Sequence, residues 1–84
     1  PYPGAWTVLN MGNESKTFKI LACKPIASTN DSPGKIWSER SDLFISGVHG
    51  RFQILQLQLE GKKPMKADEF IRGARNLNLF SIES

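Results

Sequence analysis

The sequence has 84 residues, of which 39% are apolar and 23% are charged. This length allows one domain with a small core, spanning residues 1–84, and the composition excludes a disordered chain. The formal net charge of +3 favours an acidic partner, and no apolar run approaches the roughly 18 residues of a membrane span. The chain opens without a secretory signal pattern and without Met, so we expect a domain of a longer protein.

Turn-forming residues divide the chain into short segments rich in β-branched and aromatic residues. These segments predict five strands: Ala5–Asn10, Lys16–Pro25, Lys35–Glu39, Leu43–Ser46 and Phe52–Glu60. Residues 77–82 either add one more short pairing segment or fray. The spacing is typical of a small antiparallel β-barrel or sandwich. The expected fold class is therefore all-β, with five to six short strands.

Apolar alternation predicts which side chains form the core. Phe18, Ile20 and Ala22 share one face of the second strand. In the first strand, the alternation places Trp6 on the apolar face. We therefore expect Trp6 and Phe18 to be buried.

The fifth strand changes phase along its length. Phe52 and Ile54 form one apolar pair, whereas Leu55, Leu57 and Leu59 follow in the opposite phase. Such a slip predicts a β-bulge between Ile54 and Leu55, which is typical of a sheet that curls into a barrel.

After Pro64 the apolar spacing becomes that of an amphipathic helix, with a stripe formed by Ala67, Phe70, Ile71 and Ala74. Lys66 is expected at the N-cap, where it has no side-chain acceptor, and Glu69 at N3 supplies half of a capping box. Met65 and Phe70 occupy the positions of a hydrophobic staple. Gly73 is expected to end the helix.

Catalytic and metal-binding groups are sparse. His49, the sole histidine, lies between glycines and is expected to be an exposed turn residue rather than a general base. Cys23, the sole cysteine, is expected to be an apolar filler, and a chain without an internal disulfide favours a reducing compartment. We predict no catalytic residue and no metal site.

Residues 61–75 hold five basic and two acidic residues, an excess equal to the whole formal net charge of +3. Arg72 follows Asp68 by four residues, so an intrahelical ion pair accounts for it. Lys62 and Lys63 occupy a turn and Arg75 lies beyond Gly73. From charge alone, these residues either contact phosphates or belong to a solvated loop.

A protein that binds single strands stacks bases on exposed aromatic rings beside basic residues. Trp6 and Phe18 are expected in the core, and Trp37 can face either way. No aromatic platform is therefore predicted.

Two motifs carry a family resemblance. PYPGAWT (1–7) and LQLQLEGKKPMKADEFIRGAR (55–75) resemble the opening and closing segments of the formyltransferase C-terminal domain family, as found in methionyl-tRNA formyltransferases. The resemblance extends loosely over the whole chain, and it is shared with 10-formyltetrahydrofolate hydrolases and sugar-nucleotide formyltransferases. Where Lys66 stands, the family usually has Ser or Thr.

The resemblance implies an OB-like β-barrel that carries no cofactor itself. In the family this barrel is joined to a Rossmann-like catalytic domain, absent from this chain, that binds 10-formyltetrahydrofolate. That enzyme formylates methionyl-initiator tRNA in the cytoplasm. The implied role here is non-catalytic binding of the tRNA backbone, with the candidate residues Lys62, Lys63, Lys66 and Arg75.

The resemblance also implies the partners: initiator tRNA and the protein's own N-terminal catalytic domain, with no membrane and a monomeric state. The alternative is a structural accessory domain of a formyltransferase-fold enzyme that acts on a folate or a sugar nucleotide.

Overall fold

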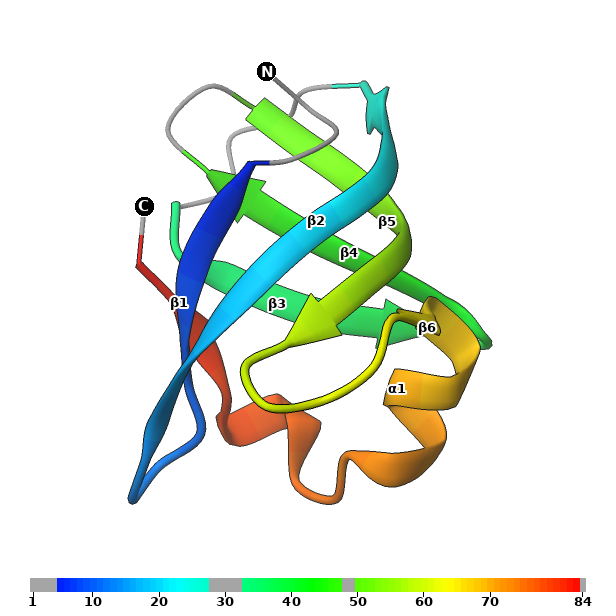
Figure 1. Cartoon of the computed structure of the whole chain (residues 1–84). Helices are drawn as coiled ribbons and strands as arrows, with labels where there is room; N and C mark the ends of the chain where they lie inside the picture. Colours follow the sequence, from blue (N-terminus) through cyan, green and yellow to red (C-terminus); the bar gives the residue numbers. More distant parts are fainter. Residues whose placement is uncertain (1–4, 28–32, 48–49, 84) are drawn as a thin grey trace.

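The structure, a computed structural model, describes residues 5–27, 33–47 and 50–83 (Figure 1). In these ranges the elements are β1 (Trp6–Asn10), β2 (Ser15–Ile26), β3 (Lys35–Glu39), β4 (Asp42–Gly47), β5 (Gly50–Leu59), β6 (Met65–Lys66), α1 (Ala67–Gly73), the 3₁₀ helix η1 (Leu77–Leu79) and β7 (Ser81–Ile82). The five predicted strands match β1 to β5 within two residues at each end, and the predicted helix matches α1.

Antiparallel pairing closes six of these strands into a barrel. Their order is β2, β1, β7, β3, β4 and β5, and β5 pairs back with β2. β6 extends the sheet beside β5, where Lys66 lies opposite Gln56. The expected all-β barrel with one short helix near the C-terminus is confirmed.

The closing strand β7 is only two residues long (Figure 1, red segment beside β1). On one side Ile82 lies opposite Leu9 of β1. On the other side Ser81 lies opposite Lys35 of β3, and the Ile82 N–H donates to the Gly34 carbonyl at 2.9 Å. The C-terminal segment therefore pairs rather than frays.

The β2–β5 ladder is irregular near its middle, where the register shifts beside Ala22 and passes over Leu55. Ile54 and Leu57 are both buried although they are three residues apart, while Leu55 is 42% exposed. Two inward side chains at odd spacing require an irregular pair in a strand. The predicted bulge is confirmed, but Leu55 does not share the inner face with Leu57 because the irregular segment turns it outward.

One cluster of buried apolar side chains fills the barrel: Leu9, Phe18, Ile20, Ile36, Leu43, Ile45, Ile54, Leu57, Ala67, Phe70 and Ile82. Phe18 is in this core as predicted. The burial predicted for Trp6 is wrong, since its side chain is 66% exposed. Leu9 lies three residues after Trp6 in the same strand and points inward, so the alternation of β1 turns Trp6 outward.

Helix α1 packs against the core through Ala67 and Phe70. The Phe70 ring meets the Phe18 ring edge to face, with centroids 5.9 Å apart and an interplanar angle of 87°. This is a favoured geometry for aromatic pairs. The helix is therefore held in the core by its apolar stripe.

The closure by β7 generates a stability prediction at Gly34. Gly34 and Gly12 have nearly equal backbone angles, φ +92° and +94°, so alanine at either position costs roughly 1–2 kcal/mol of left-handed strain. A Cβ on Gly34 would also meet the Ile82 carbonyl oxygen at 3.1 Å, whereas a Cβ on Gly12 would meet nothing within 4 Å. Gly34→Ala should therefore lower the free energy of unfolding in urea by clearly more than Gly12→Ala. Equal losses would contradict a tight closure.

Candidate nucleic-acid interface

The turn after β5 holds two candidate residues, Lys62 and Lys63. The Lys62 N–H donates to the Leu59 carbonyl at 3.0 Å, and the Gln58 side-chain amide donates to the Lys62 carbonyl at 2.9 Å. Gly61 takes the left-handed conformation, φ +79°, that the turn requires. The backbone of the turn is thus fixed, while both lysine side chains are exposed.

Glu60 is the acidic residue adjacent to this turn in sequence. Its carboxylate accepts a hydrogen bond from the Thr17 N–H at 3.0 Å, and its own N–H donates to the Thr17 carbonyl at 3.0 Å. These bonds direct Glu60 toward β2. Among the residues that the structure describes, no carboxylate forms an ion pair with Lys62 or Lys63.

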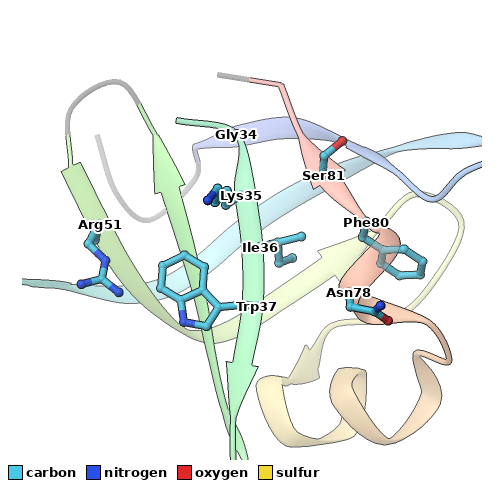
Figure 2. A pocket seen from close by; sticks show the side chains of 8 residues that line it. All are labelled: Gly34, Lys35, Ile36, Trp37, Arg51, Asn78, Phe80 and Ser81. Atoms are coloured by element: carbon cyan, nitrogen blue, oxygen red, sulfur yellow. The ribbon is translucent and has the colours of Figure 1, made fainter. Parts of the chain in front are cut away.

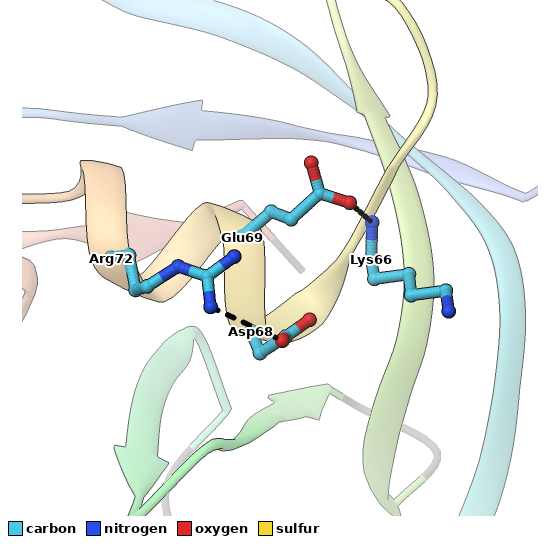
Figure 3. Close-up of polar contacts among 4 residues, drawn as sticks. All are labelled: Lys66, Asp68, Glu69 and Arg72. Carbon is cyan, nitrogen blue, oxygen red and sulfur yellow. Dashed lines mark hydrogen bonds and ion pairs between the residues drawn. The ribbon is translucent and has the colours of Figure 1, made fainter.

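Lys66 is the N-cap of α1, with extended backbone angles. Its N–H donates to Glu69 Oε1 at 3.4 Å (Figure 3), so the predicted half of a capping box is confirmed. The reciprocal bond cannot form, because a lysine ammonium has donors only. The helix therefore begins with an incomplete cap.

The ion pair predicted within α1 is also present. Arg72 Nη1 lies 3.6 Å from Asp68 Oδ2 (Figure 3), and the two side chains are 72% and 44% exposed. An exposed pair of this kind contributes about 0.3–0.5 kcal/mol. The charge of Arg72 is thus compensated within the helix by Asp68.

Lys62 and Arg75 come together at an apolar groove of about 360 Å³. The groove is lined by Met11, Leu59, Lys62, Met65, Glu69, Phe70, Gly73, Ala74, Arg75 and Phe80. Arg75 reaches this place because α1 ends at Gly73, where the Ala74 N–H donates to the Ile71 carbonyl at 3.3 Å. The groove is therefore lined by two cations from separate parts of the chain and by one acidic residue, Glu69.

Lys66 lies at a different depression, which Asp42 and Asp68 also line. Met65 and Lys66 are successive residues of β6, so their side chains point to opposite sides. The structure therefore places Lys62 and Arg75 at one groove together with Glu69. Lys63 lies in the same turn as Lys62, and Lys66 lies at another depression together with Asp42 and Asp68.

A second cationic surface was not predicted from the sequence. Trp37 stacks on Phe44, with centroids 5.6 Å apart and an interplanar angle of 23°. The Arg51 guanidinium carbon lies 4.8 Å from the centroid of the Trp37 ring. Trp37, which could have faced either way, is half-buried beside a basic residue. The alternation of Lys35, Trp37 and Glu39 is a signal in the sequence, but Arg51 is found only from the strand register.

Cys23 and His49 are the remaining candidate groups. Cys23 is half-buried as expected, and burial raises the pKa of its thiol, which keeps it protonated and unreactive near neutral pH. In the ranges that the structure covers, no three His, Cys, Asp or Glu side chains cluster as a metal site would need. The described helices are also too short or too polar to cross a membrane. His49 lies outside the described residues.

Comparison with known proteins supports the resemblance. The family described as "Formyl transferase, C-terminal domain" matches residues 1–75. The methionyl-tRNA formyltransferase of Rhodopseudomonas palustris (strain HaA2) is 44% identical over 73 residues, which are 87% of this chain and 22% of that protein. That of Chlorobium phaeovibrioides is 44% identical over 77 residues, 87% of this chain and 23% of that protein. The chain thus spans less than a quarter of these relatives. No solved structure matches.

The incomplete cap at Lys66 generates a second stability prediction. In Lys66→Ser, the hydroxyl can accept a hydrogen bond from the Glu69 N–H and complete the capping box. We expect this change to raise the free energy of unfolding by about 0.5–1 kcal/mol, measured by urea denaturation. Lys63→Ser, at an exposed turn position, should stay within about 0.5 kcal/mol of the original chain. A destabilised Lys66→Ser variant would contradict the capping account.

Proposed function

Because the chain belongs to the formyl transferase C-terminal domain family, we propose that it is the non-catalytic tRNA-binding part of a methionyl-tRNA formyltransferase. The parent enzyme would transfer a formyl group from 10-formyltetrahydrofolate to methionyl-initiator tRNA in the cytoplasm. The folate and the reacting groups would belong to the remainder of the parent. This chain would act by holding the tRNA.

The observation that carries the proposal is the uncompensated charge of Lys62, Lys63 and Arg75. Within the described ranges, none of the three forms an ion pair with a carboxylate. The carboxylate next to their turn, on Glu60, is engaged by the Thr17 N–H. Exposed cations without internal partners are available to phosphates, which supply most of the affinity of a non-specific RNA contact.

The geometry suits backbone binding rather than sequence readout. Lys62 and Lys63 are compact charges on flexible stems, presented by a fixed turn. Arg75 adds a planar guanidinium that can contact a phosphate with two N–H groups. Such contacts orient an RNA without distinguishing its bases. Specificity for the initiator would then come from the remainder of the parent enzyme.

The barrel would also contact its own catalytic domain. The exposed indole of Trp6 lies on the first strand, in the motif that resembles the entry into the barrel. Tryptophan is enriched in protein interfaces, so this ring, which is 66% exposed, is a candidate contact for another part of the protein. A monomeric parent remains our expectation.

The proposal predicts the salt dependence of tRNA binding. Removing one cation that binds a phosphate should reduce the magnitude of the slope of log K against log salt concentration by about 1. We expect Lys62→Gln, Lys63→Gln and Arg75→Gln each to weaken binding of initiator tRNA at low salt and to flatten this slope. Fluorescence anisotropy of labelled tRNA at several salt concentrations measures both effects.

Lys24→Gln is the matched control, since it removes one exposed charge from β2, away from the Lys62 turn. It should leave the slope unchanged. If all four variants bind alike with equal slopes, the turn is not the RNA contact. Binding of tRNA too weak to detect even at low salt would favour the accessory role.

A further inference from the structure

The groove of Lys62 and Arg75 has an apolar lining that the proposed backbone contacts do not use. Its volume is about 360 Å³, within the roughly 300–1,000 Å³ typical of sites for small molecules. Phosphates would lie at the two cations, which leaves the apolar lining for another part of the same RNA. The apolar residues of the lining come from separate segments of the chain: Met11, Leu59, Met65, Phe70, Ala74 and Phe80.

This lining suits a planar ring. Phe70 is buried in the core and gives the groove a fixed base. Phe80 is half-buried, and its ring points away from β3 (Figure 2). Met11 and Met65 are also half-buried, and thioether side chains adapt to the shape of a ring that packs against them. An unpaired nucleobase is the planar part of an RNA that proteins hold in this way.

Glu69 is the acidic residue that lines the groove. Its Oε1 accepts a hydrogen bond from the Lys66 N–H at 3.4 Å (Figure 3). Within the part of the chain that the structure describes, its other carboxylate oxygen accepts no hydrogen bond and forms no ion pair. The Glu69 side chain is exposed, so this oxygen can accept a hydrogen bond from a ligand in the groove.

A carboxylate at the groove distinguishes cytosine from uracil. Cytosine carries an exocyclic amino group, a donor that the carboxylates of Glu and Asp accept in contacts with nucleic acids. Uracil has a carbonyl oxygen at the same position, and a carboxylate repels it. The groove therefore favours a base with an amino group.

We propose that this groove receives one unpaired base of the bound RNA, whose exocyclic amino group donates to Glu69 while the flanking phosphates lie at Lys62 and Arg75. The inference deepens the proposed function, on which it rests for the identity of the ligand. It adds a preference for one kind of base to phosphate contacts that carry no sequence information of their own.

The two methionines of the chain both line the groove and therefore report on it directly. In a chain labelled with carbon-13 at the methionine methyl groups, NMR gives one signal for Met11 and one for Met65. We expect hexacytidylate to shift both signals, because the ring current of a bound base acts on nearby methyl groups. An abasic oligonucleotide with the same number of phosphates should bind through the cations and shift neither signal.

Substitution of Glu69 provides the second arm. Hexacytidylate should bind roughly fivefold more tightly than hexauridylate, a ratio that corresponds to about one hydrogen bond. In Glu69→Gln the two affinities should become nearly equal, because an amide can also donate to the uracil carbonyl. The amide oxygen can still accept from the Lys66 N–H, so the start of α1 is retained.

Glu60→Gln is the matched control, since it removes the same charge beside the Lys62 turn and can still accept the hydrogen bond of the Thr17 N–H. It should keep the preference for hexacytidylate. The same loss of preference in Glu60→Gln would assign it to charge alone and contradict the role of Glu69. Equal affinity of the original chain for the two oligonucleotides, or methionine signals that do not respond to hexacytidylate, would overturn the base site.

The two proposals fail separately. If Lys62→Gln and Lys63→Gln flatten the salt slope of tRNA binding while hexacytidylate leaves both methionine signals unchanged, the backbone contact stands and the base site is wrong. If hexacytidylate shifts both signals, whereas tRNA shifts neither and its binding ignores Lys62 and Lys63, the groove binds a nucleotide and the proposed tRNA contact is wrong.

Discussion

The pairing of two residues, Ser81 and Ile82, between β1 and β3 is the contact on which the rest of the molecule depends. Without it, β1 and β3 would both present open edges, which are prone to intermolecular pairing. With it, Ile82 enters the core, and the chain before it is drawn across one end of the barrel (Figure 1). Phe80 then lines the groove of Lys62 and Arg75. One short backbone contact thus decides the fold and the geometry of the proposed RNA surface together.

The fold also separates cations that are adjacent in sequence. Arg72 forms an ion pair with Asp68 within α1. Lys66 lies on the opposite side of β6 from Met65, beside the acidic residues Asp42 and Asp68. Lys62 and Arg75, thirteen residues apart, line one groove together with a single acidic residue, Glu69. The proposed RNA surface therefore depends on which cations the fold leaves without an ion pair, more than on the total charge of residues 61–75.

Local patterns predicted most of the fold, because strand alternation, the bulge in β5 and the apolar stripe of α1 each depend on residues close in sequence. The predicted burial of Trp6 was wrong because a five-residue strand has too few alternating residues to show which of its faces points inward. The two-residue β7 has no periodicity at all. The cluster of basic residues in the sequence was enough to predict the candidate lysines. The contact of Arg51 with Trp37 depends instead on the register of three strands, which no local pattern encodes.

The central claim is that RNA contacts the end of the barrel where the Lys62 turn, Arg75 and Phe80 meet. Amide chemical shifts of the labelled chain, recorded during titration with initiator tRNA at low salt, test this residue by residue. The account predicts that the largest shifts fall on residues 61–63, on residues 74–75 and on Phe80. Shifts concentrated instead around Lys19 and Lys24 of β2, with the Lys62 turn unperturbed, would contradict it.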